Sequence, residues 1–135
     1  MGKIFGHRGL PRIYRENSIT GLNKAFNYCD YVETDVRITA DNNIILFHDP
    51  DINGELINEL STEEILNKLN DVEKDELILS SRDQIEGKVN FEIKTNSLEK
   101  TQIDILFQKM LSLLLPHLIG KQSKTSKNYL LAIME

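Results

Sequence analysis

The sequence predicts an α/β fold with a largely parallel sheet. Short β-rich segments alternate with segments whose apolar residues recur at helical spacing, the order typical of strands joined by crossover helices. The length of 135 residues suits one domain, and 40% apolar with 27% charged residues is typical of a globular protein. In such folds ligands bind beyond the carboxyl ends of the strands, so polar residues there are candidate site residues.

The first elements are a strand, a helix and a hairpin. Residues 4–6 are a short apolar run that ends in glycine. Asn17 and Ser18 are favourable helix caps, and apolar residues at helical spacing follow them. Tyr31–Ile38 and Ile44–His48 are β-rich segments on either side of an Asp-Asn-Asn turn signal, so we expect them to pair as a hairpin.

Later elements follow the same alternation. Residues 61–64, Ser-Thr-Glu-Glu, are a capping-box signature and predict a helix up to Leu69. Residues 77–79 predict a short strand or turn, and residues 80–86 a brief helix or loop. Val89–Lys94 predicts a compact strand, and a long helix is expected at 98–118.

We place one domain at residues 1–120 and a polar linker with an apolar tail at 121–135. The net charge of −5, without a dense block of lysine or arginine, argues against a nucleic-acid partner. No run approaches the roughly 20 apolar residues that a membrane span needs. One cysteine, Cys29, and the lack of an apolar leader favour a cytoplasmic protein.

Two predicted strands carry carboxylates on one face. Side chains alternate along a strand, so Glu33 and Asp35 share a face while the neighbouring valines point to the core. Glu92 and Lys94 share a face of the motif F-E-I-K in the same way. If the two strands are neighbours, three carboxylates meet and need a positive charge among them. Hard oxygen ligands suit Mg²⁺ or Ca²⁺.

Each feature alone also has a purely structural explanation. Two carboxylates on a strand are more often exposed to solvent, and a glutamate–lysine pair more often forms a surface ion pair. His7 alone could be a hydrogen-bonded structural residue, and His48 could mark the start of a turn because Pro50 follows. Polar residues at several strand ends at once favour a functional site.

Five motifs, in this order, resemble the glycerophosphodiester phosphodiesterase family: H-R-G at 7–9, E-N-S at 16–18, E-T-D-V at 33–36, H-D at 48–49 and F-E-I-K at 91–94. The resemblance covers roughly residues 3–96. It implies a (β/α)₈ TIM barrel, truncated here to roughly the first half because a complete barrel takes about 250 residues. It also implies metal-dependent hydrolysis of glycerophosphodiesters to an alcohol and glycerol 3-phosphate.

The resemblance further implies roles for eight side chains. The implied metal ligands are Glu33, Asp35 and Glu92. The implied general acid/base pair is His7 and His48. Implied partners of the substrate are Arg8, Lys94 and, in support, Glu16. In this family a glycerol hydroxyl of the substrate attacks first and water opens the resulting cyclic phosphate; which histidine serves which step stays open, as does the choice between Mg²⁺ and Ca²⁺.

Two other functions remain open. A phosphatidylinositol-phospholipase C-like phosphodiesterase would share the paired histidines, and a non-catalytic half-barrel fragment would bind metal or phosphate without turnover. The chain departs from the family pattern at Arg15, where proline is usual. Because a half-barrel has open edges, we expect a homo-oligomer or a partner in place of the missing C-terminal half.

Overall fold

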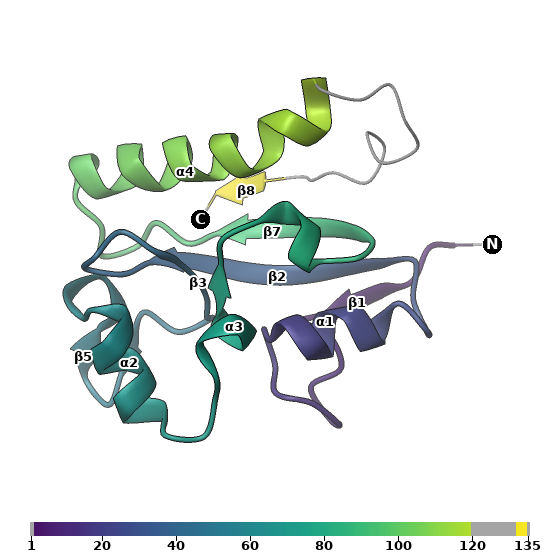
Figure 1. Cartoon of the computed structure of the whole chain (residues 1–135), viewed down its shortest axis with the longest axis horizontal. Coiled ribbons are helices and arrows are strands. Elements are labelled where there is room, and N and C mark those ends of the chain that lie inside the picture. The colour runs from purple at the N-terminus through teal and green to yellow at the C-terminus, as the bar shows by residue number, and fades with distance from the viewer. Residues whose placement is uncertain (1, 120–131, 135) are drawn as a thin grey trace.

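The computed structural model describes residues 2–119 and 132–134, which form a mixed sheet with helices packed on it (Figure 1). The sheet has the strand order β6–β3–β2–β7–β8, with β1 also beside β2. Its strands are β1 (Phe5–His7), β2 (Tyr31–Ile38), β3 (Ile44–Leu46), β6 (Ile78–Leu79), β7 (Lys88–Ile93) and β8 (Ala132–Met134).

The long strand β2 organises the sheet because it has three neighbours. Its first half pairs in parallel with β1, where His7 lies opposite Glu33. Its second half pairs with β3, and β7 runs parallel along its other edge with Asp35 opposite Glu92. The predicted hairpin is therefore confirmed, and the strands that carry the carboxylates are neighbours.

The sheet is less parallel than predicted. The pairs β1–β2, β2–β7 and β7–β8 are parallel, whereas β3 pairs antiparallel with both β2 and β6. The tight turn at residues 39–43 explains the first reversal: Asn42 has a φ of 63°, and a connection this short can only reverse the chain.

Within residues 2–119 and 132–134, four α-helices complete the fold: α1 (Ile19–Ala25), α2 (Thr62–Leu69), α3 (Lys74–Leu77) and α4 (Lys100–Ile119). Ser18 caps α1 by accepting a hydrogen bond from the Gly21 amide. Ser61 and Glu64 form the predicted capping box of α2. Short 3₁₀ helices at Ile57–Glu59 and Arg82–Gln84, and a small hairpin of β4 (Asp51–Ile52) and β5 (Glu55–Leu56), lie between these elements.

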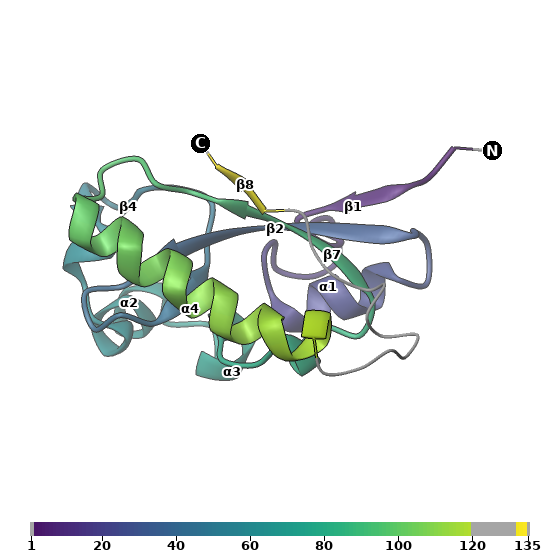
Figure 2. The same ribbon diagram turned by 90° about the horizontal axis from the view of Figure 1, so that it is seen from above.

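The main core lies between the sheet and the helices α1 and α4 (Figure 2). Leu106, Met110 and Leu114 recur every four residues, so they form one stripe of α4, and all three are buried against the sheet. The exposed side chains of Leu111 and Leu115 lie on the rest of this apolar helix. Burying the valines and Phe91 on this face leaves the carboxylates of β2 and β7 on the other.

Some predictions fall outside the described residues. Most of the predicted linker and tail, 121–131 and 135, lies there, and the proposed domain boundary stays a prediction. Residues 132–134 form β8. Among the described residues, no helix combines the length and apolar character that a membrane crossing requires.

Candidate functional site

An acidic cluster lies on the polar face of the sheet. Glu33, Asp35 and Glu92 each offer one carboxylate oxygen, and these three oxygens lie within 4.8 Å of one another. The cluster follows from strand pairing, since alternation puts Glu33 and Asp35 on one face and the register sets Glu92 beside Asp35. Asp35 is completely buried, and Glu33 is 9% exposed.

Simultaneous negative charges on all three carboxyl groups of the cluster are energetically unfavourable. Burial, which is the largest cause, acts together with the charge of Asp35 and the hydrogen bond and charge of Glu92 to raise the pKa of Glu33 from 4.5 to about 8. Both side-chain oxygens of Glu33 and Oδ1 of Asp35 are buried without a hydrogen-bond donor among the described residues. Buried oxygens without donors, held this close, fit a hard divalent cation.

Arg8 compensates part of this negative charge. Its Nε lies 3.2 Å from Asp35 Oδ2, and its Nη1 lies 3.5 Å from Glu16 Oε2. The backbone places this side chain, because the Arg8 amide donates to the carbonyl of Glu33 at 2.8 Å and Arg8 has a φ of 59°. Gly9 follows with a φ of 91°, and a Cβ there would lie 2.8 Å from the backbone of Gly21, so only glycine permits this close approach to α1.

Lys94, the residue directly after β7, supplies a second cation. Its Nζ lies 3.0 Å from Glu92 Oε1 and 3.9 Å from Asp35 Oδ1, although the residue is only 7% exposed. The Lys94 amide donates to the carbonyl of Val36, which continues the pairing of β7 with β2. Two cations and three carboxylates therefore share one small region.

Asn17 holds Asp35, one member of the acidic cluster, through hydrogen bonds. Its Nδ2 donates to Asp35 Oδ2 at 3.1 Å, while its Oδ1 accepts from Thr34 Oγ1 and from the Asp35 amide. The sequence pattern predicts Asn17 as a helix cap, yet Ser18 provides the cap and Asn17 is buried against β2. Its left-handed φ of 52°, which asparagine tolerates, turns the side chain toward the strand.

The two histidines lie in different surroundings. His7 Nε2 is 3.5 Å from Glu33 Oε2, and its side chain is 68% exposed. His48 is half-buried, and its Nδ1 lies 2.7 Å from Asp49 Oδ1. The contact with Asp49 engages Nδ1, one of the two ring nitrogens of His48.

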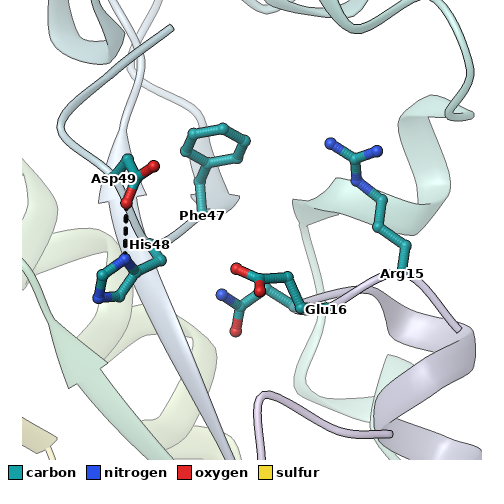
Figure 3. Close-up of a pocket in the computed structure, with 6 residues that line it drawn as sticks. Arg15, Glu16, Phe47, His48 and Asp49 are labelled. Atoms are coloured by element: carbon teal, nitrogen blue, oxygen red, sulfur yellow. Dashed lines mark hydrogen bonds and ion pairs between the residues drawn. The ribbon is translucent and has the colours of Figure 1, made fainter. Parts of the chain in front are cut away.

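His48 lines two cavities, each of about 290 Å³. Figure 3 shows His48 and Asp49 on one side of the first cavity and Arg15 and Glu16 on the other, with Phe47 above them. The second cavity is lined by Arg37, His48, Pro50, Lys94 and Asn96. His48 thus shares the first cavity with Glu16 and the second with Lys94, and both of these residues are substrate-binding candidates.

Arg37 is a further polar residue of β2 near the site. It is 5% exposed and continues the face of β2 that carries Glu33 and Asp35. The side-chain alternation that predicts a shared face for Glu33 and Asp35 also predicts that Arg37 lies on that face. The roles assigned to all eight candidate residues stay predictions.

Comparison with known proteins identifies the family. Residues 7–111 match the sequence pattern described as the glycerophosphoryl diester phosphodiesterase family. Comparison with curated protein sequences found no significant match.

Solved structures share the fold. The chain resembles an Oleispira antarctica phosphodiesterase solved with the product sn-glycerol-3-phosphate (TM-score 0.68, 20% identity), covering 99% of this chain and 57% of that one. It also resembles glycerophosphodiester phosphodiesterases from Parabacteroides distasonis (TM-score 0.65, 22% identity, 98% and 56% covered) and Thermotoga maritima (0.62, 22%, 99% and 54%).

These structures have a TIM-barrel fold, and the chain spans just over half the length of each. The fold prediction of about half a (β/α)₈ barrel is confirmed. The match of residues 7–111 covers most of the sequence, and the family depends on a divalent metal, for which the chain has a suitable acidic group. The chain therefore belongs to the glycerophosphoryl diester phosphodiesterase family.

Proposed function

We propose that this chain carries a metal-dependent site that hydrolyses glycerophosphodiesters to an alcohol and glycerol 3-phosphate. The observation that carries the proposal is the cluster of buried Glu33 and Asp35 with partly buried Glu92, next to the side chains of Arg8 and Lys94. The family match and the product bound to the Oleispira antarctica relative support the substrate class.

Glu33, Asp35 and Glu92 would hold the cation, Mg²⁺ or Ca²⁺. The buried oxygens of Glu33 and Oδ1 of Asp35, which have no donor among the described residues, and the raised pKa of Glu33 are the features expected of ligands for a cation. When bound, the cation supplies Lewis-acid stabilisation of the phosphoryl charge.

Arg8 and Lys94 bind and orient the phosphodiester. Their nitrogens already lie beside the carboxylates of Asp35 and Glu92, so both carry their charge into the site. An arginine fork suits two phosphoryl oxygens, and a lysine acts as a point charge. Glu16 holds the Arg8 guanidinium from its outer side, which makes it a supporting residue.

His7 and His48 move the protons. One imidazole takes the proton of the attacking hydroxyl, and the other gives a proton to the oxygen of the departing alcohol. Asp49 orients His48 through Nδ1, whereas His7 lies against Glu33. His7 ends strand β1, and His48 follows Phe47, whose amide donates to the carbonyl of Asp35.

Two measurements test this function. Calorimetric titration with Mg²⁺ and with Ca²⁺ tests the site, and release of glycerol 3-phosphate from glycerophosphocholine tests turnover. Glu33→Gln, Asp35→Asn and Glu92→Gln should each abolish both signals, while Glu63→Gln, which changes an exposed glutamate of α2, should keep both.

The outcomes separate the candidate functions. Cation binding without product would favour a binding module over an enzyme, and no cation binding would refute both. Size-separated fractions assayed in parallel will show which oligomeric state, monomer or homo-oligomer, carries the turnover.

A further inference from the structure

Arg37 joins three segments that surround the candidate site. From β2, its Nε and Nη2 donate to the carbonyl oxygen of His48 at 3.0 and 2.5 Å. Its Nη1 donates to Oδ1 of Asn96 at 3.1 Å, in the segment after β7. The strand with the carboxylate pair is thereby tied to the segments that follow β3 and β7.

The backbone around His48 is anchored to β2 on both sides. The amide of Phe47 donates to the carbonyl of Asp35 at 3.1 Å, and the carbonyl of His48 accepts from Arg37. His48 lines two cavities and is 36% exposed in its side chain, so side-chain packing holds it only in part. The position of the imidazole relative to Asp35 therefore depends on these backbone anchors.

We propose that Arg37 is a positioning residue for His48. It fixes the His48 carbonyl, and with it the place of the imidazole over the polar face of β2, by donating two hydrogen bonds to one oxygen while a third holds Asn96. This inference rests on the proposed function only for its effect on rate, since the placement of His48 can be measured without turnover.

Only arginine supplies this set of contacts. Its guanidinium is a rigid plane of five donors, so two nitrogens reach one oxygen while the third points elsewhere. A lysine in its place keeps the positive charge but has one nitrogen at the end of a flexible chain. Arg37→Lys therefore removes the geometry and retains the charge.

Arg82 provides a matched control. It is also 5% exposed, and it also donates to two backbone carbonyls, those of Ile85 at 2.7 Å and Gly87 at 2.6 Å. Ile85 and Gly87 come just before β7, so these contacts lie at its N-terminal end. Glu92 lies near its C-terminal end. Arg82→Lys thus makes the same chemical change at an arginine that holds the backbone of Ile85 and Gly87 and not that of His48.

The experiment compares Arg37→Lys and Arg82→Lys in the full chain. The imidazole signals of His48 are recorded by NMR, with His48→Gln to assign them, and kcat and KM are measured for glycerophosphocholine. We expect Arg37→Lys to shift or broaden the His48 signals and to lower kcat by about 10- to 100-fold with KM changed less than about threefold. Arg82→Lys should leave the His48 signals, kcat and KM unchanged.

The two kinds of failure are distinguishable. Unchanged His48 signals in Arg37→Lys, or equal changes in both variants, would overturn the positioning role. If the wild-type chain shows no turnover, the proposed function fails, and a shift of the His48 signals in Arg37→Lys alone still supports the positioning role. Turnover of Arg37→Lys at the wild-type rate would refute the effect on catalysis.

Discussion

Asn17 is joined by two hydrogen bonds to Asp35, a member of the acidic cluster. Nδ2 of Asn17 donates to Oδ2 of Asp35, and the amide of Asp35 donates to Oδ1 of Asn17. One carboxamide thus satisfies a backbone group of β2 and fixes one oxygen of a candidate ligand. The other oxygen of Asp35, Oδ1, remains without a donor among the described residues and faces the cluster.

Replacing Asn17 should lower stability in two separable ways. Asn17→Gly removes the amide but tolerates the φ of 52°, so we expect a loss of about 1–3 kcal/mol in the free energy of unfolding. Asn17→Ala adds strain from a left-handed alanine, about 1 kcal/mol more. Urea unfolding measures both, and wild-type stability of Asn17→Gly would show that the amide contributes nothing.

Cation affinity should rise with pH up to about pH 8. The pKa of Glu33 is about 8, so at neutral pH this carboxyl is mostly protonated and a cation must displace the proton. Below that pKa, affinity should fall by about tenfold for each pH unit, with about one proton released per cation bound. Calorimetry in two buffers of different ionisation enthalpy measures both quantities. Equal affinity at about pH 6 and about pH 8.5 would contradict the assignment.

Without a cation, Glu33 should make the fold less stable as the pH rises. Its pKa is 4.5 in the reference state and about 8 in the folded chain, so the folded state holds the proton over this interval. The stabilisation is fully present below about pH 4.5 and is lost as the pH rises through about 8. After solvent screening, Glu33→Gln should be more stable than wild type by about 2 kcal/mol at pH 9, with chelator present.

The check on this prediction is the pH dependence of the difference. Urea unfolding at about pH 5, 7 and 9 should show a gap between Glu33→Gln and wild type that widens with pH. A constant gap would mean that Glu33 titrates alike in the folded and unfolded chains.

The two histidines should respond differently to the leaving group. Replacing the general acid costs about 10²- to 10⁴-fold with an alcohol of ordinary acidity, because its oxygen departs poorly without a proton. The same variant should recover much of its rate with a nitrophenol leaving group. His7→Gln and His48→Gln assayed on both substrates will assign the roles. Full activity of His48→Gln on the ordinary substrate would refute its role.

Packing of α4 should depend on one stripe of the helix. Leu106 is completely buried, so Leu106→Ala should lower the free energy of unfolding by about 2–5 kcal/mol. Leu111 on the same helix is 53% exposed, and Leu111→Ala should change it by less than about 1 kcal/mol. Equal losses in urea unfolding would show that something covers Leu111 in solution.

Alternation explains why the acidic cluster was predictable. A strand has a side-chain period of two, so the pattern of Glu33 and Asp35 between buried residues indicates their shared face without coordinates. The same rule applies to Glu92 between Phe91 and Ile93. Pattern alone did not establish that the two strands are neighbours, because that contact joins residues far apart in the chain.

Other features depended on local backbone geometry or on long-range pairing. Asn17 reaches Asp35 only because of its left-handed conformation, which no periodicity indicates. The small β4–β5 hairpin turns at Asn53-Gly54, a known hairpin signal, but strands of two residues have no detectable alternation. The antiparallel place of β6 depends on its pairing with β3, more than 30 residues away in the sequence.

The register that sets Glu92 opposite Asp35 also has a consequence for how the chain folds. The β2–β3 hairpin closes a short loop and belongs to the fast events of folding, whereas β7 must return across more than 50 residues to reach β2. Until that strand pairs with β2, Glu92, the third candidate ligand, is absent from the cluster. The rate of cation uptake during refolding would therefore measure how fast β7 pairs with β2, which is the slowest long-range step of folding.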